Sequence, residues 1–303
     1  MADDKKIIEE YKKAFSEYVK DGIIDLDSRL KTKFTFQIHR LETIVNKLKG
    51  VIPPFRQSHY FITLVKKGSG QKSVGHFTFP IKKRTLLITP KRVIHSSRYW
   101  SKCSGYILCF NLDFFLQKAF PKQHIVGKKI FKKSVKPFLT LSEGQVKKLE
   151  VIFEYIIKEH KGGLNQKNEM IAVKILELLI HCDRFFSDAH DQGCEEIYNH
   201  TIEQFNELLE KQFAVKRSVK FYAESLYLHP NHLNFLSKKH TGLTAKETIN
   251  NRILMEAKYL LTSCPLSIKE IAHQLGFEYA ESFHSFFKKY VQMTPSEYRL
   301  EFT

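Results

Sequence analysis

The chain has 303 residues, of which 43% are hydrophobic and 13% aromatic, and its formal net charge at pH 7 is +17. This length accommodates one large or two ordinary domains, and the composition excludes an intrinsically disordered chain. No apolar run approaches the roughly eighteen residues that a membrane-spanning helix needs, so we expect no contact with a membrane.

The N-terminal segment MADDKKIIEEYKKAF is charged from its third residue, which is unlike a signal peptide. Residues 3–20 place isoleucine, tyrosine and phenylalanine at helical spacing and predict a short amphipathic helix. The five cysteines are odd in number and have no CxxC spacing, which is typical of reduced thiols. We therefore expect a cytoplasmic protein.

Positive charge is unevenly distributed along the chain. Residues 201–303 contribute +2 to the net charge and residues 1–200 contribute +15. A basic balance attracts nucleic-acid phosphates, but a lysine-rich solvated surface explains the same excess. Net charge alone therefore does not locate a nucleic-acid-binding segment.

Short β-rich runs separated by Gly, Pro and Ser occupy about residues 34–115. The runs are FTFQI, HYFITLV, KSVGHFTFPI, RTLLITP and GYILCFNL. Regularly spaced short strands of this kind predict a small barrel or jelly roll.

The segments QSHYFITLVKKGSG and LLITPKRVIHSS resemble the two strand motifs of a cupin, with His59 and His95 as their histidines. A metal-binding cupin uses His-x-His, a glutamate and a further histidine, but Gln57 stands at the first position and no acidic residue lies between Glu42 and Asp113. We therefore expect no metal, no cofactor and no catalytic site. His59 and His95 are expected to be ordinary barrel residues or to line an effector pocket. The lysine-rich barrel favours an anionic effector, although solvated lysines explain the same charge.

Helical periodicity returns at about residues 142–186. Val146, Leu149, Phe153 and Ile156 form one stripe, and the segment NEMIAVKILELLIHCDRFF is apolar nearly all round. Packing against the barrel and pairing with a second subunit in a homodimer both fit this pattern. The polar stretch that follows predicts a domain boundary, with 1–190 as an effector-sensing and dimerisation domain, 191–196 as linker and 197–303 as a second domain.

A supersecondary unit is repeated within residues 197–303. SVKFYAESLYLHPNHLNFLSKKHTGLT (218–244) aligns with SIKEIAHQLGFEYAESFHSFFKKYVQMT (267–294) at a spacing of 49 before the turn and 50 after it. In the second copy, Ser267 and Glu270 have capping-box spacing and Gly276 is suited to a left-handed turn. Each copy therefore predicts two helices joined by a tight turn.

The segment between the copies predicts one long helix, because residues 244–264 contain no breaker before Pro265. At 1.5 Å per residue it spans roughly 30 Å. One turn of B-DNA is about 34 Å, so two units on such a spacer suit two successive major-groove segments of one duplex.

These residues carry a resemblance to a known family. SIKEIAHQLGF, SFHSFFKKY and MTPSEYR closely resemble the second-motif signature of the AraC/XylS family of bacterial transcription regulators, and GLTAKETINNRILMEAKYLL resembles its linker helix. The resemblance covers about residues 197–303. It implies an all-α DNA-binding domain with two helix-turn-helix units, acting usually as an activator on promoter DNA with RNA polymerase. The strand-rich segment is similar, more weakly, to the family's cupin-type domain, so the expected fold is α+β with two domains.

The resemblance and the helical period together name candidate DNA-facing residues. In the first unit they are Pro230, Asn231, His232, Asn234, Phe235, Lys238 and Lys239, and in the second Tyr279, Glu281, His284, Ser285, Lys288 and Lys289. Asparagine pairs with adenine, phenylalanine packs on a thymine methyl, and the lysines suit phosphates.

Five positions depart from the family pattern. Tyr227 and Gln292 replace usual glycines, Phe235 and Ser285 replace usual arginines, and Glu281 replaces a usual serine. A carboxylate is repelled by phosphate, so we hypothesise that the first unit supplies most of the base-specific binding energy. Two alternatives stay open at this point: a helical protein-interaction module with a non-catalytic cupin, and, least favoured, a metal-dependent cupin enzyme.

Overall fold

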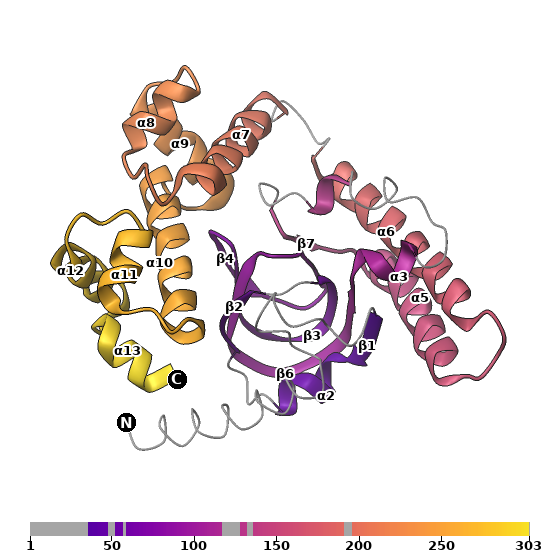
Figure 1. Ribbon diagram of the computed structural model, residues 1–303. Helices are drawn as coiled ribbons and strands as arrows, with labels where there is room; N and C mark the ends of the chain where they lie inside the picture. The colour runs from indigo at the N-terminus through magenta and orange to yellow at the C-terminus, as the bar shows by residue number, and fades with distance from the viewer. Residues whose placement is uncertain are drawn as a thin grey trace.

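The computed structural model describes residues 36–47, 52–56, 59–116, 128–131, 136–190 and 196–302. A strand-rich part precedes a helical part along the chain, and the two lie side by side (Figure 1). A strand-rich N-terminal region and a helical C-terminal region were both predicted, and both are confirmed. The predicted helix at residues 3–20 lies outside the described residues.

The described strands form one seven-stranded antiparallel sheet in the order β1-β6-β3-β5-β7, with β2 paired to β6 and β4 paired to β3. The strands are β1 (Phe36–Arg40), β2 (Ile52–Arg56), β3 (Tyr60–Val74), β4 (Phe77–Ile81), β5 (Thr85–Thr89), β6 (Ile94–Phe110) and β7 (Phe138–Thr140). The sequence did not predict β2, the first half of β6, β7, or the short helices α2 (Leu41–Lys47) and α3 (Leu112–Leu116).

The sheet curls strongly because its two longest strands bend together (Figure 1). Strands β3 and β6 pair along most of their length, and their register shifts three times between Val65 and Gln71. Gly105 lies opposite this bend with a φ of +148°, and a Cβ there would lie 1.9 Å from the Leu64 carbonyl oxygen. Only glycine permits so close an approach of the two backbones.

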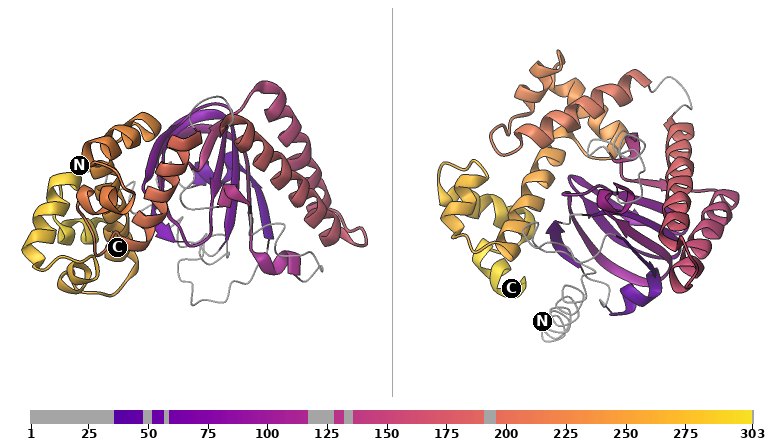
Figure 2. Two further views of the ribbon diagram at one scale, coloured as in Figure 1. Left: turned by 90° about the horizontal axis from the view of Figure 1, so that it is seen from above. Right: turned by 45° about the vertical axis from the view of Figure 1, so that its right-hand side comes forward.

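Strand alternation gives the sheet one face toward helices and one toward its own interior. Tyr60, Ile62 and Leu64 of β3 belong to a core shared with helices α5 (Glu143–Lys161) and α6 (Lys167–His190). Val65 and Trp100 belong to a second core, inside the curl. Helices α5 and α6 lie against the outer face of the sheet, which Figure 2 shows from two further directions. Helix α6 ends at His190, four residues beyond the predicted end.

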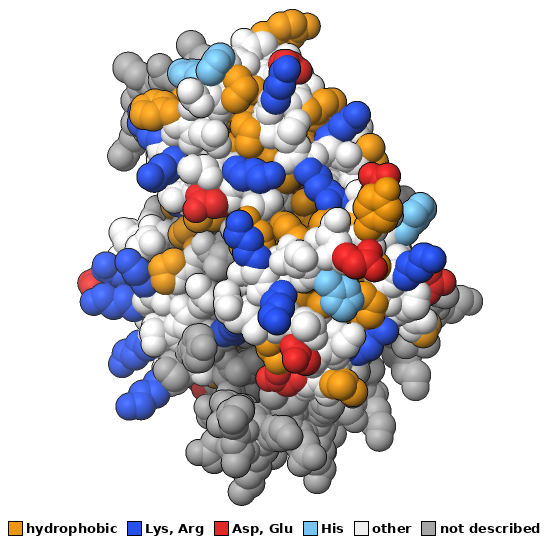
Figure 3. Space-filling view, turned by 90° about the vertical axis from the view of Figure 1, so that its left-hand side faces the viewer, with side chains coloured by type: hydrophobic (Ala, Val, Ile, Leu, Met, Phe, Trp, Pro, Cys, Tyr) orange, Lys and Arg blue, Asp and Glu red, His pale blue; other side chains and the backbone are white. Residues whose placement is uncertain are grey.

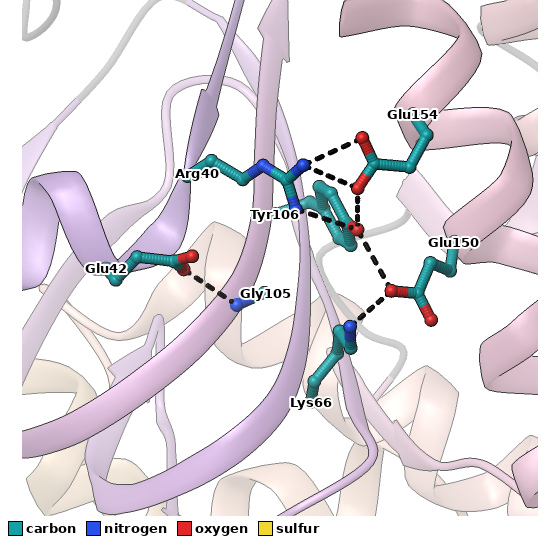
Figure 4. Close-up of polar contacts among 7 residues, drawn as sticks. All are labelled: Arg40, Glu42, Lys66, Gly105, Tyr106, Glu150 and Glu154. Carbon is teal, nitrogen blue, oxygen red and sulfur yellow. Dashed lines mark hydrogen bonds and ion pairs between the residues drawn. The ribbon is translucent and has the colours of Figure 1, made fainter.

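A polar network fixes α5 on the sheet (Figure 4). The buried hydroxyl of Tyr106 accepts from Arg40 at 3.1 Å and lies within hydrogen-bond distance of Glu150 and Glu154 on α5. Arg40 also binds Glu154 at 2.7 Å, and Lys66 binds Glu150. Burial raises the pKa of Tyr106, and the Lys66 ammonium lowers the pKa of Glu150. The phenol of Tyr106 therefore stays neutral and the Glu150 carboxylate stays ionised.

The helical part is built around one long central helix, α10 (Ala245–Ser263). The other helices are α7 (Glu196–Gln212), α8 (Val219–Ser225), α9 (Pro230–Thr241), α11 (Ile268–Gln274), α12 (Ala280–Val291) and α13 (Pro295–Phe302). The predicted linker helix at 244–264 is confirmed, with Thr244 as its N-cap and Glu247 completing a capping box. Its buried face packs against both helix pairs and α13.

A cluster of charged side chains, most of them buried, joins the two parts, and we call it the interface charge cluster. Arg252 of α10 binds Glu210 of α7 at 2.8 Å and Glu256 at 2.9 Å, and Arg56 of β2 binds Glu256 at 2.7 Å. The Nδ1 atom of His76, which follows β3, lies 3.7 Å from Glu210. The cluster therefore links β2, α7 and α10.

Candidate functional site

The first helix pair is α8 and α9. The Ser218 side chain accepts from the Phe221 amide at the start of α8, and Pro230 begins α9, where its missing N–H costs nothing. His229 is the N-cap of α9, and its Nδ1 atom accepts from the Asn231 amide at 3.3 Å. Leu233 and Leu236 are buried against the core, so the opposite side of α9 is turned to solvent.

The second pair, α11 and α12, repeats this build with one more residue in its turn. The predicted capping box of Ser267 and Glu270 is confirmed, with both hydrogen bonds present. The predicted left-handed Gly276 is also confirmed, with a φ of +71°. Phe283 and Phe287 are fully buried on the inner side of α12.

The turn of the second pair packs on the segment that leads into the first. A Cβ at Gly276 would lie 1.8 Å from the Ala214 carbonyl oxygen. Beside it, an Arg217 N–H donates to the Leu275 carbonyl at 2.7 Å, and the Arg217 guanidinium lies 3.5 Å from the ring centre of Phe277. This contact, together with α10, fixes one helix pair relative to the other.

Tyr227 occupies the corresponding turn position of the first pair. It has a φ of +56° and is 97% exposed. The sequence marked it as a replaced glycine but did not suggest how far its ring projects from the surface.

The candidate DNA-facing residues lie on the outer sides of α9 and α12, and Tyr279 is the N-cap of α12. In the first pair the exposed ones are Asn231, His232, Phe235, Lys238 and Lys239, while Pro230 and Asn234 are half-buried. In the second pair the exposed ones are Tyr279, Glu281, Ser285, Lys288 and Lys289, while His284 is half-buried. Figure 3 shows this side of the helical part, where basic, acidic, histidine and hydrophobic side chains are interspersed. The structure thus places the two sets on two separate helices.

The sequence matches a helix-turn-helix domain family over residues 222–301, which includes most of both pairs and all of α10. RhaS, a helix-turn-helix transcriptional activator of Salmonella schwarzengrund, is 31% identical over 98 residues, which are 32% of this chain and 35% of RhaS. The Msm operon regulatory protein of Streptococcus mutans is 24% identical over 251 residues, which are 82% of this chain and 86% of that protein. Residues 222–301 therefore form an AraC-type helix-turn-helix domain, and the chain is similar to transcription regulators of the AraC/XylS family.

The domain match does not establish the activity of the whole chain. The Escherichia coli regulator YijO is 28% identical over 138 residues, which are 45% of this chain, and the chain spans 48% of YijO's length. The family match lies in the helical part alone. What the chain binds and regulates is therefore inferred below from its own residues.

The strand-rich part encloses a cavity of about 50 Å³. Its walls include Phe55 of β2, Lys72 of β3, and His95 and Trp100 of β6. His95, a candidate effector-pocket residue, thus lines a cavity. His59, the other candidate, is buried but is not among the residues that line this cavity.

Lys72, like Phe55 and Trp100, lines this cavity and was missed by sequence reasoning. Only 6% of it is exposed, and its Nζ lies 3.0 Å from His95 Nδ1 and 3.3 Å from Ser97 Oγ. Burial lowers the pKa of Lys72 to about 7. Burial, followed by the Lys72 charge, also lowers the pKa of His95. The imidazole is therefore neutral and accepts a hydrogen bond from the amine.

Within the described ranges, no three His, Cys, Asp or Glu side chains gather in a way that would hold a metal ion. None of the helices that the structure describes is long and apolar enough to span a bilayer.

Proposed function

We propose that the chain is a sequence-specific DNA-binding transcription regulator in which α9 and α12 are the recognition helices of two helix-turn-helix units. The observation that carries this proposal is that the two helix pairs have the same arrangement. Each has a capped first helix, a left-handed turn residue and a second helix that is buried on one side and polar on the other. A helix presented in this way fits the major groove.

The spacing of the pairs supports binding to successive grooves. Helix α10 has 19 residues, which at 1.5 Å per residue give about 28 Å. Successive major-groove segments on one side of a duplex are about 34 Å apart. The capping box at Thr244 and the packed face of α10 make the helix a firm spacer.

The two units have different surface chemistry, which supports unequal roles. Asn231 and His232 on α9 are exposed polar groups without a nearby carboxylate on the same helix. Exposed Glu281 lies in the first turn of α12 and opposes phosphate binding there. We therefore assign most of the base-specific energy to the first unit and phosphate contacts to Lys238, Lys239, Lys288 and Lys289.

Selection from random duplex DNA by the full chain, at near-physiological salt, tests the proposal. We expect two short elements about one helical turn apart. Enrichment of a single element would refute base-specific binding by both helix-turn-helix units. If no element is enriched and binding disappears as the salt concentration rises, sequence-specific binding is refuted altogether.

Two matched substitutions test the division of labour. Asn234→Ala is expected to weaken binding to the selected site by about 1–3 kcal/mol and to relax the preference at one base pair. His284→Ala, at the corresponding half-buried position of the second unit, is expected to have a smaller effect. A larger loss from His284→Ala would overturn the assignment.

For residues 1–190 we propose a cupin-like domain that senses an effector and forms a homodimer. Support for dimerisation comes from hydrophobic side chains that α5, α6 and the turn between them leave exposed: Val151, Tyr155, Leu164, Met170, Val173 and Ile180. Apolar surface of this kind favours a second copy. Dimerisation would link two DNA-binding domains and so raise their effective concentration at DNA. Sedimentation of the full chain and of Val151→Glu tests this, since a dimer should become a monomer.

A last proposal concerns how the regulator acts. We propose activation of transcription at a bacterial promoter through contact with RNA polymerase, which places the chain in the cytoplasm. An in-vitro transcription assay on the selected DNA distinguishes activation from repression.

One observation favours the alternative of a protein-interaction module. Tyr227, Phe235 and Tyr279 are 97%, 61% and 60% exposed, and aromatic side chains are common anchors of protein interfaces. The selection experiment separates the two readings, because a protein-interaction module enriches no DNA element. If the helical part binds another protein, Tyr227→Ala should abolish binding of that protein and leave the outcome of the DNA selection unchanged.

A further inference from the structure

The internal cavity combines hydrogen-bond donors with a lack of acidic groups. The Lys72 ammonium has three N–H donors, of which one points to His95 and one to Ser97. Trp100 Nε1 is buried and has no hydrogen-bond partner within the described part of the chain. Both residues line the cavity. Two donors are therefore left for something that accepts hydrogen bonds.

A buried cation needs a counter-charge, and the cavity walls do not supply one. No acidic residue occurs in the sequence between Glu42 and Asp113, the stretch that contains β2 to β6. The described residues lining the cavity include no aspartate or glutamate. Burial of an ammonium without a carboxylate is unfavourable. An anion that entered the cavity would remove this penalty.

The rest of the wall selects an organic anion. Its remaining surface is largely apolar and aromatic, with Phe55 4.0 Å from His95 between ring centres and Trp100 beneath the Lys72 ammonium at 5.7 Å. A volume of about 50 Å³ holds roughly three to five water-sized atoms, at about 10–15 Å³ each. A short aliphatic chain with a charged head matches both the size and the wall.

We propose that this cavity binds a small monocarboxylate, whose oxygens accept hydrogen bonds from Lys72 Nζ and Trp100 Nε1, and that this anion is the effector. The inference rests on the proposed function, because it names the ligand of the sensor domain. Lys72 holds the charge, Trp100 fixes the orientation of the carboxylate, and Phe55 packs against the alkyl group.

The neighbouring strand residues connect the cavity to the helical part. Phe55 lines the cavity, and Arg56, the next residue of β2, binds Glu256 on α10 at 2.7 Å. Lys72 lies on β3, and His76, in the turn that follows this strand, lies against Glu210 of α7. A carboxylate that shifts either strand therefore acts directly on the interface charge cluster.

Trp100 makes the test direct, because it is the one tryptophan in the sequence. Its emission is followed while sodium propionate is added to the full chain, with sodium chloride at equal ionic strength as the reference. We expect a saturable change with propionate and none with propionamide, the neutral analogue of the same shape. An identical response to propionamide, or no saturable response to propionate, would overturn the proposal.

Two variants of one strand provide the matched pair. Lys72→Met removes the ammonium and is expected to weaken propionate binding at least about tenfold, since it removes a charge-assisted hydrogen bond. Lys67→Met changes an exposed lysine of the same strand and is expected to leave binding unchanged. Equal affinities for all three proteins would refute a role for Lys72. If Lys72→Met does not fold, the comparison of propionate with propionamide decides the question.

DNA selection separates this inference from the proposed function. If the chain enriches DNA elements but does not bind propionate, only the carboxylate inference fails. If it binds propionate but enriches no DNA, the regulator proposal fails and the binding site stands. The effector role is supported when propionate changes the affinity for the selected DNA in the wild type and not in Lys72→Met, and an unchanged affinity refutes it.

Discussion

The turn of the second helix pair offers a sharp test of how the helical part is held together. At Gly276 the backbone has a φ of +71°, which costs a residue with a side chain roughly 1–2 kcal/mol. A new Cβ would also lie 1.8 Å from the Ala214 carbonyl oxygen. The turn and the Ala214 segment then have to separate by more than 1 Å, and overpacking of this kind costs about 1–3 kcal/mol. Gly276→Ala should therefore lose about 3 kcal/mol of unfolding free energy.

The chain contains a matched control for this substitution. Gly242, after α9, has a φ of +78° and nothing within 4 Å of its would-be Cβ. Gly242→Ala should therefore lose only the backbone term of roughly 1 kcal/mol. Urea unfolding of both full-length variants, followed by helical circular dichroism, measures the difference. If the two losses agree within about 0.5 kcal/mol, Gly276 is needed only for its backbone angle, and the close contact with Ala214 does not hold the turn.

Three further substitutions test the buried charges and the first turn. Lys72 has a pKa of about 7 in the folded chain and near 10.5 in the unfolded chain, so the wild type loses unfolding free energy as pH falls from about 10.5 to 7. At pH 7 the unfolding free energy of Lys72→Met should therefore exceed that of the wild type by up to about 5 kcal/mol, and the difference should shrink as pH rises. Urea titrations across this pH range measure the difference. Burial acts to raise the pKa of the Glu210 carboxyl, but His76 and Arg252 outweigh it and lower it to about 2. The ionised Glu210 carboxylate therefore stabilises the fold above the unfolded pKa near 4.5, and this stabilisation is lost as pH falls. Between pH 5 and 2 the unfolding free energy of the wild type should fall by up to about 3 kcal/mol more than that of Glu210→Gln. Tyr227→Gly removes the strain of a positive φ at a fully exposed side chain. After the entropy cost of glycine, the free energy of unfolding should rise by about 0.5–1 kcal/mol, which a higher thermal midpoint would report. A lower midpoint would show that the ring makes contacts that stabilise the fold.

The helix pairs were predictable from the sequence because their signals are local. Ser267 and Glu270 lie three residues apart, and Gly276 follows the helix that they begin, so one short stretch specifies the whole unit. The long helix between the pairs was predictable for the same reason, since nothing in it breaks the helical period. Its ends were located to within one residue.

The cavity was not predictable, because its residues meet only through strand pairing. Lys72 and His95 are 23 residues apart and meet because β3 and β6 pair in a register that shifts three times. The first half of β6, HSSRYWSKCS, has neither alternation nor a hydrophobic run, so no strand pattern marked Trp100. The interface charge cluster is equally long-range, since Arg56 and Glu256 are 200 residues apart.

The cavity and the interface charge cluster share β2, and this sets how a ligand signal reaches the helical part. Successive side chains of a strand point to opposite faces, so Phe55 touches the cavity and Arg56 touches α10. Arg56 also lies over the ring of Tyr259 on the same helix, at 4.7 Å. A movement of β2 at the cavity wall is therefore transmitted to α10, which carries both helix pairs.

Arg56→Ala isolates this step. The substitution leaves every cavity-lining side chain in place, so propionate should still change Trp100 emission with unchanged affinity. The affinity for the selected DNA should no longer respond to propionate, because the link between β2 and Glu256 is lost. If the response persists in Arg56→Ala, the signal travels instead along β3 to His76 and Glu210, and His76→Ala should then abolish it.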